Sequence, residues 1–354
     1  MAMAMAARLQ LLLPITPPTP SSCRPPRVSA RPPPARPRRP PALPIPAAAA
    51  TTGGAQSTPA SGKLTLKLTY LEINSWVWEV QRQDAQAPPL RILVDPILVG
   101  NLDFGAPWLF DGAKRDPHVR ALSVDDLLAA DLDLLLITQS LDDHCHARTL
   151  TQLAARAPDL PVVTTPNARP ALAALPAPFR RVTFLEPGQS AALAGGALGV
   201  LATAGPVLGP PWQRPENGYI LTAGGGGVLY YEPHCVYDAA FVEERRLRAE
   251  VVITPVVKQL LPAGFTLVSG QEEAVGLARR LGARYVVPMS NGDVDAGGIL
   301  ASVLATEGTT HSFKAMLAEA LPEAQVLDPT PGVPLQIQLD LETSDGQQPQ
   351  AAAA

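Results

Sequence analysis

Apolar and polar residues alternate along the chain from about residue 63, and this alternation predicts the first structural elements. Residues 64–70 and 75–80 carry apolar side chains at every second position, as half-buried antiparallel strands do. The further predicted strands are 91–94, 132–137, 162–163, 199–202, 219–222, 228–231, 251–254 and 285–288. Helical spacing of apolar residues predicts helices over 148–156, 271–281 and 311–321. Ser123 and Asp126 resemble a capping box that starts another helix.

The order of these elements indicates one large domain over residues 63–335. Strands come first, and strands that alternate with helices follow, twice along the chain. This pattern alone predicts a large α/β or α+β domain. Gly224 to Gly227 lie between two predicted strands without a Lys-Ser/Thr pair, so they indicate a hairpin turn and not a phosphate-binding loop.

The two ends of the chain differ in composition from this domain. Residues 1–71 contain no Asp or Glu, and seven Arg lie before residue 60 among many Pro and Ala. Such an acid-free, basic leader is typical of an organelle transit peptide, here residues 1–58. We expect a chloroplast address, with the mitochondrion as the alternative; a disordered Pro-rich segment without an address would have a similar composition. Residues 342–354 are rich in Gln and Ala and predict a disordered tail.

Charge excludes one class of partner. The leader holds seven of the 28 basic residues and none of the 32 acidic ones, so the remainder has 21 basic against 32 acidic residues, a net charge of −11. A body this acidic lacks the positive surface that binds nucleic acid. No apolar run approaches the length of a transmembrane segment. The expected partner is therefore a small molecule or a protein, whose identity the sequence leaves open.

The segment 138–146, Thr-Gln-Ser-Leu-Asp-Asp-His-Cys-His, follows the predicted strand 132–137 directly. It resembles the H-x-H-x-D-H signature of the metallo-β-lactamase superfamily. Asp143 and His144 match the last two ligands of that signature, whereas Gln139 and Leu141 stand at the positions of its first two histidines. Other segments resemble the family in the same order along the chain: 68–75, 94–96, 217–221, 229–231, 252–255 and 286–289. The chain is thus identified as a diverged, plant-type member with an incomplete signature.

The resemblance implies an α+β fold, an αββα sandwich of two mixed β-sheets flanked by helices. It also implies where the other metal ligands of the family would stand. Pro206 takes the position of the third His, His234 that of the bridging Asp, and Ser290 that of the last His. Because proline and leucine cannot bind a metal, this substitution pattern excludes a two-metal centre. Asp143, His144 and His234 leave a set that could hold at most one divalent ion such as zinc, with no metal as the alternative.

Three functions follow as hypotheses. The first is a weak or single-metal hydrolase of a small organelle substrate, with Asp143 and His144 as catalytic residues. The second is a non-catalytic binding or scaffold protein, in which Asp143 caps a loop and His144 bonds a backbone carbonyl. The third is a thiol redox module of Cys145 and Cys235, against which stands the usual role of free cysteines as small buried residues.

Four further residues are candidates for the rim of the site. Trp212 and Arg214 belong to a Pro-rich loop, where Arg214 could bind a substrate carboxylate or phosphate, or pair with Glu216 instead. Asn291 and Asp293 follow the predicted strand 285–288 and could replace the last ligand by hydrogen bonding. The irregular segment 103–111 is a further candidate for the rim, and His146 is expected to be solvated.

Overall fold

The computed structural model describes residues 62–82, 88–208 and 212–341. The predicted transit peptide (1–58) and the predicted tail (342–354) lie outside the described residues. Within these ranges, no helix combines the length and the apolar character needed to cross a bilayer.

Two large mixed sheets form the centre of the described part of the chain. The first has seven strands in the order β19-β1-β2-β3-β5-β6-β7. Their bounds are β1 (Gly62–Tyr70), β2 (Trp76–Arg82), β3 (Leu90–Val94), β5 (Leu134–Ile137), β6 (Val162–Thr164), β7 (Val182–Phe184) and β19 (Pro334–Leu341). β19, β1, β2 and β3 pair antiparallel, and β3, β5, β6 and β7 pair parallel.

The second sheet repeats this mixture over the described residues, with seven strands in the order β18-β15-β12-β11-β10-β9-β8. Their bounds are β8 (Ser190–Leu193), β9 (Leu198–Ala204), β10 (Asn217–Ala223), β11 (Gly226–Tyr231), β12 (Val251–Pro255), β15 (Tyr285–Met289) and β18 (Gln325–Val326). The strands β8 to β11 pair antiparallel and β11, β12, β15 and β18 pair parallel.

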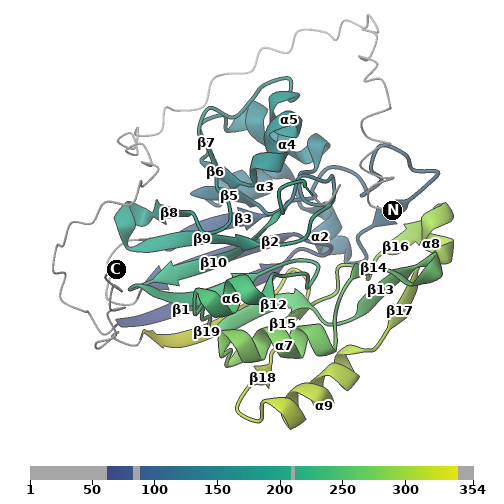
Figure 1. The fold of residues 1–354 in the computed structure, drawn as a ribbon. Helices are drawn as coiled ribbons and strands as arrows, with labels where there is room; N and C mark the ends of the chain where they lie inside the picture. The colour runs from purple at the N-terminus through teal and green to yellow at the C-terminus, as the bar shows by residue number, and fades with distance from the viewer. Residues whose placement is uncertain (1–61, 83–87, 209–211, 342–354) are drawn as a thin grey trace, which may run out of the picture.

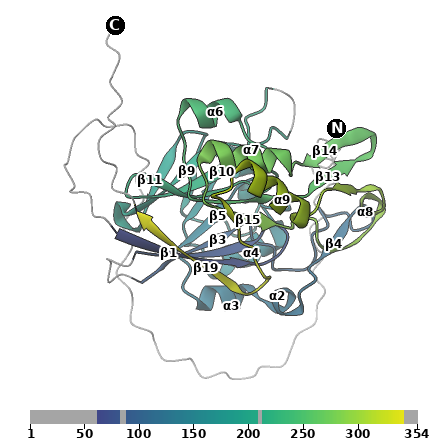
Figure 2. The ribbon, with the colours of Figure 1, turned by 90° about the horizontal axis from the view of Figure 1, so that it is seen from below.

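Helices cover the outer face of each sheet, which gives four layers (Figures 1 and 2). On the first sheet lie α2 (Pro117–Ala121), α3 (Val124–Ala129), α4 (Ala147–Arg156) and α5 (Arg169–Ala173). On the second lie α6 (Ala239–Glu244), α7 (Glu272–Leu281) and α9 (Thr310–Ala320). The 3₁₀ turns are η1 (Pro166–Ala168), η2 (Ala194–Gly196) and η3 (Pro262–Gly264). This is the predicted αββα sandwich.

The core between the sheets follows from the alternation seen in the sequence. Leu64, Leu66 and Leu68 on β1 are fully buried, and they belong to one cluster with Tyr219 on β10 and Ile253 on β12. The outer faces carry two further clusters, one under α3, α4 and α5 and one under α7 and α9. Buried apolar area of this kind is the main favourable contribution to folding.

A smaller lobe projects from one side of the sandwich (Figure 1). It contains a three-stranded sheet of β13 (Lys258–Leu261), β14 (Phe265–Val268) and β17 (Ala305–Glu307), a two-stranded sheet of β4 (Asp111–Ala113) and β16 (Asp295–Gly297), and the helix α8 (Ile299–Val303). The hydrophobic pattern did not predict these elements, because they are short and because β16 and β17 are exposed along their whole length. The lobe forms part of the site described below.

Local predictions can be compared with the structure. Ser123 caps α3 in a complete capping box with Asp126, as predicted. Gly224 and Gly225 have positive φ angles of 59° and 87° in the turn between β10 and β11, so the predicted hairpin turn is confirmed. At the C-terminal end, β19 pairs with β1 up to Leu341, so the sheet continues past residue 335, where the pattern placed the end of the domain.

Candidate metal centre

Polar residues meet at one edge of the two sheets. Asn74 lies in the turn after β1, Asp95 follows β3, and Asp143 and His144 follow β5. From the second sheet, His234 follows β11. Since each residue lies in the segment that follows a strand, the packing of the two sheets brings them together from distant parts of the chain.

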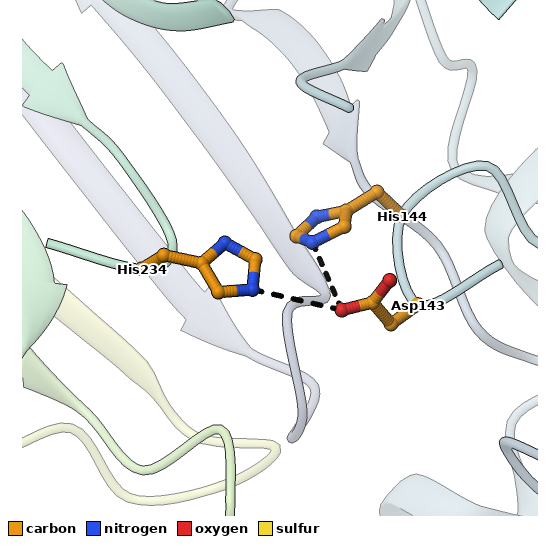
Figure 3. A group of neighbouring side chains, drawn as sticks. All are labelled: Asp143, His144 and His234. Atoms are coloured by element: carbon orange, nitrogen blue, oxygen red, sulfur yellow. Dashed lines mark ion pairs between the residues drawn. The ribbon is translucent and has the colours of Figure 1, made fainter. Parts of the chain in front are cut away.

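Asp143, His144 and His234 form the centre of this group (Figure 3). One ligand atom from each lies within 4.8 Å of the other two, and all three residues are buried. Asp143 Oδ2 is 3.1 Å from His144 Nε2 and 3.8 Å from His234 Nε2. The separation of Asp143 and His144 is close to that expected of donors around one ion, since bonds to zinc of about 2.0–2.2 Å place tetrahedral donors a little over 3 Å apart. His234 stands further from Asp143, at 3.8 Å.

Asp95 fixes the orientation of His144 from the opposite side. Its Oδ2 lies 2.9 Å from His144 Nδ1, and it also accepts the hydroxyl of Thr138 at 2.5 Å and that of Tyr231 at 3.3 Å. Its Oδ1 accepts the backbone N–H of Thr138 at 2.8 Å. This contact keeps the Nδ1 proton of His144 facing the carboxylate, so that Nε2 points at Asp143. Histidine ligands of metals commonly have such a carboxylate partner.

His234 is held by Gln139 and Glu232. Gln139 Nε2 lies 2.8 Å from His234 Nδ1. Gln139 stands at the position of the family's first His and His234 at that of its bridging Asp, so two substituted positions contact each other. Glu232 Oε2 accepts the backbone N–H groups of His234 at 3.1 Å and of Val236 at 2.7 Å. Burial raises the pKa of Glu232 to about 8, against the effect of these two donors.

The charges in the cluster follow from burial and proximity. Burial disfavours an imidazolium, but Asp143 and Asp95 outweigh it and raise the pKa of His144 to about 10. For His234, burial and the positive charge of His144 lower the pKa to about 4, with Asp143 opposing. Burial would raise the pKa of Asp143, but the two imidazoles outweigh it and the pKa falls below its usual value. At neutral pH these shifts give an ionised Asp143, a charged His144 and a neutral His234.

A cavity of about 160 Å³ opens beside this cluster. Asn74, Asp143, His234 and Asn291 provide polar groups to its lining, and apolar side chains from the projecting lobe and from the segment 102–110 form most of the rest. The expectation that residues near 103–111 form a rim is thus supported. Leu141, at the position of the family's second His, is one of the apolar lining residues. A position that binds metal in the family has become part of a hydrophobic wall.

The remaining substituted positions do not contribute donors to the cluster. Pro206 lies in the loop after β9, where its carbonyl accepts the backbone N–H of Glu216. Ser290 is exposed and lines a different depression, together with Asp293 and His311. Together with Leu141, these positions leave no second set of ligands among the described residues, and a two-metal centre does not fit.

Some of the predicted rim residues line the cavity and others lie outside its lining. Asn291 lines the cavity, donates to the carbonyl of Pro233 at 2.8 Å and accepts from Gln259 at 2.9 Å. Asp293 lies outside the cavity lining and forms an ion pair with Arg115. Arg214 pairs with Glu186 at 2.8 Å and not with Glu216, and it is also outside the lining. Trp212 is 85% exposed.

Two expectations about the loop itself need correction. His146 is completely buried, with Nδ1 2.8 Å from the Thr149 hydroxyl, whereas a solvated side chain was expected. The start of α4 packs against the first sheet, so it removes this ring from water. The capping role considered for Asp143 belongs to Asp142, whose Oδ1 accepts the backbone N–H of Ala147 at 3.0 Å.

The two cysteines of the domain are free and buried in separate places. Cys145 belongs to the core cluster outside the first sheet and Cys235 to the cluster outside the second. Burial raises the pKa of each thiol above its usual value, which suppresses the reactive thiolate. The structure gives the hypothesis of a thiol redox module no support.

We expect neither cysteine to react with a thiol reagent in the folded state. In a Cys23→Ser variant, labelling with Ellman's reagent should be slow without denaturant and should reach both thiols in guanidinium chloride. The physical reason is that thiolate formation in an apolar cluster requires local opening. Rapid labelling of both thiols in the native protein, or their joint loss on mild oxidation, would contradict this expectation.

Sequence patterns did not identify several residues that shape the cluster. Asp95, Thr138 and Tyr231 surround His144, but each stands at a strand end or within a strand without a motif of its own. Asn74 is similar: its Nδ2 donates to the carbonyl of Asp143 at 3.1 Å across 69 residues of sequence. Their position could have indicated them, because all of them lie at or near strand ends, on the same edge of the sheets as the signature loop.

Comparisons with known proteins agree with this architecture. The profile of the Beta-lactamase superfamily domain matches residues 67–290, which is more than half of the chain. No curated protein matches. Among solved structures, the chain is similar to a metallo hydrolase from the hyperthermophilic archaeon Ignicoccus hospitalis, at 17% identity and a TM-score of 0.50 over 78% of this chain and 100% of that one. It is also similar to an isothiocyanate hydrolase from Delia radicum gut bacteria, at 18% identity and a TM-score of 0.51 over 77% and 98%. These two likenesses concern the fold, and with the matched profile they lead to one conclusion: the chain belongs to the metallo-β-lactamase superfamily.

Proposed function

We propose that the protein is a hydrolase that uses one divalent metal ion, held by Asp143, His144 and His234. The observation that carries this proposal is the convergence of the three donors within 4.8 Å, with Asp95 behind His144. A bound divalent ion polarises a substrate carbonyl and lowers the pKa of water, which is the chemistry that hydrolysis needs. Three protein ligands would leave room for water or substrate on such an ion, as in catalytic zinc sites.

Unpartnered oxygen atoms support a cation at this place. Two buried side-chain oxygens without a hydrogen-bond partner belong to residues at the cluster, namely Asn74 Oδ1 and Asp143 Oδ1. A buried acceptor without a partner is costly, and an ion or ordered water is the usual explanation. The donor set also has the right chemistry once a metal ion displaces the Nε2 proton of His144, since neutral imidazole and carboxylate are common zinc ligands.

Gln139 is suited to adjust His234 for this role. Ligation through Nε2 requires the proton of His234 to be on Nδ1, which then needs an acceptor. The Gln139 amide provides one when its Oε1 faces the ring, and the same amide donates through Nε2 in the opposite orientation. Gln139 would therefore hold His234 in either tautomer, while Asn74 and Asn291 can orient a polar group of the substrate in the cavity.

A binding protein that uses no metal is the second candidate. The observation that favours it is the position of His144 between Asp95 and Asp143, where a proton on the imidazole neutralises charge without an ion. The cavity would then bind its ligand without catalysing a reaction. The two candidates differ in metal content, and this difference decides between them.

Metal analysis of the full-length protein tests the proposal. After incubation with Zn²⁺ and removal of excess, we expect about one equivalent of metal, and a rise in melting temperature relative to protein kept in EDTA. Asp143→Asn keeps the shape of the side chain and His234→Gln keeps a neutral polar side chain, and both variants should lose the metal and the thermal shift. Asp159→Asn, an exposed carboxylate in an ion pair with Arg180, serves as the matched control and should retain both.

Two results would overturn the proposed hydrolase. One is wild-type protein that is folded, as judged by circular dichroism, and takes up no Zn²⁺, Mn²⁺ or Fe²⁺. The other is metal that remains in both ligand variants, because it would then be bound elsewhere. In the first case, the binding protein becomes the supported function.

A further inference from the structure

The walls of the cavity beside Asp143 have a composition that limits which ligands can enter. Leu102, Phe104, Phe110 and Leu141 form apolar surface on one side, and Leu300 and Leu304 add to it from the projecting lobe. Val294 and Leu102 belong to a separate buried cluster, against which Phe104 and Phe110 pack, so that this wall is a built hydrophobic surface. Such a surface favours a ligand with a hydrocarbon or aromatic body.

Charge complementarity is lacking for an anion. Among the described residues that line the cavity there is no lysine or arginine, and Asp143 contributes a negative charge. Arg115, which follows β4, forms ion pairs with Asp293 and Asp295. Arg214 is engaged with Glu186. An anionic ligand would lose its hydration without gaining a cationic partner from these walls.

Exposed apolar residues adjoin the cavity lining along the chain. Trp108 is 64% exposed and Ile299 59% exposed, and they are neighbours, since the backbone N–H of Ile299 donates to the carbonyl of Trp108. Each precedes a residue that lines the cavity, Leu109 and Leu300. Val303, also exposed, lies on the same helix α8. Exposed apolar side chains thus stand next in sequence to residues of the hydrophobic lining.

We infer that the cavity takes a neutral, predominantly apolar small molecule, and that its side-chain walls, taken without the metal ion, discriminate against anions. This inference rests on the proposed function, because it takes the cavity beside the metal ligands as the substrate site. The ligand places its apolar body between the lobe and the segment 102–110, and one uncharged polar group near Asn74 and Asn291. For a hydrolase, the implied substrate class is a small neutral ester, amide or related electrophile with an apolar substituent.

A matched pair of aromatic probes tests this inference. 2-Naphthamide and 2-naphthoate have nearly the same shape and differ in charge. Their binding to the full-length protein is measured by isothermal titration calorimetry in EDTA, so that the carboxylate cannot bind a metal ion. We expect the amide to bind at least about tenfold more tightly, because burial of an unpaired carboxylate is costly.

One substitution in the cavity wall and a matched substitution outside it provide the control. Leu300→Lys places a cation in the half-buried lining and should reduce or reverse the preference for the amide. Val333→Lys adds the same charge at an exposed position outside the lining and should leave the preference unchanged. Equal or tighter binding of 2-naphthoate by the wild type, absence of binding by the amide, or an equal effect of the two lysines would overturn the inference.

The outcomes are separable from those of the metal analysis. A protein that prefers the amide but takes up no metal would overturn the hydrolase and support this ligand class. A protein that takes up one metal ion but shows no preference for the amide would support the hydrolase and overturn this ligand class.

Discussion

The Asp95→Asn variant is expected to lose about 3–5 kcal/mol of unfolding free energy, because it removes one partner of a buried charged pair. Asp95 is completely buried and its two oxygens accept hydrogen bonds from Thr138, His144 and Tyr231. An amide in its place brings an NH₂ group against one of these donors. Asparagine also tolerates the positive φ of 40° at this position, so the loss reports on the side chain and not on backbone strain.

Urea denaturation followed by circular dichroism measures this loss. The control is Asp159→Asn, which removes an exposed ion pair with Arg180 and should change the unfolding free energy by less than about 1 kcal/mol. Equal losses in the two variants would mean that Asp95 does not anchor His144. In the metal-binding assay, Asp95→Asn should also weaken affinity for Zn²⁺ about 10- to 100-fold, as loss of a partner behind a ligand does.

The Gly227→Ala variant is expected to lose about 2–3 kcal/mol or more, since it forces an atom into occupied space. Gly227 is the second residue of β11 and pairs with Thr222, beside the irregular register with β10. A Cβ added there would lie 1.8 Å from the carbonyl oxygen of Arg248. Because the obstacle is backbone, it cannot be relieved by a side-chain rotation, and the segment before β12 must shift.

The adjacent glycine is the matched control for this effect. A Cβ on Gly226 would have its nearest neighbour, the carbonyl oxygen of Ala223, at 3.9 Å, which is ordinary contact. Gly226→Ala should therefore change the unfolding free energy by less than about 0.5 kcal/mol. If both variants unfold at the same urea concentration, the close approach of Arg248 to Gly227 is not a feature of the folded protein.

Much of the fold could be predicted from local patterns. The alternation in 64–70 predicted β1 and the buried face that contributes Leu64, Leu66 and Leu68 to the core between the sheets. The helical spacing in 271–281 predicted α7, whose Leu277 and Ala278 are buried. The short strands of the projecting lobe could not be predicted, because three exposed residues carry no periodicity and their pairing depends on distant partners, as between Asp295 and Ala113.

The candidate site was predicted in part for a similar reason. The motif identified Asp143 and His144, and the order of strands identified His234, because these positions resemble a known family. Arg214 was expected on the rim, but its ion pair with Glu186 depends on the packing of two loops that no local pattern relates. Asp95 was recognised as the end of a strand and not as the partner of His144, since these residues are 49 positions apart.

Local sequence was enough to show which side chains alternate on each strand, and which ligands of the family are absent at Gln139, Leu141, Pro206 and Ser290. These are local properties, set by side-chain periodicity and residue chemistry. The packed fold was needed to show that His234 lies near Asp143, that Gln139 contacts His234 across 95 positions, and that Leu141 forms part of a cavity wall. Such contacts depend on strand order and on the packing of one sheet against the other, which bring together residues whose local sequences carry no information about each other.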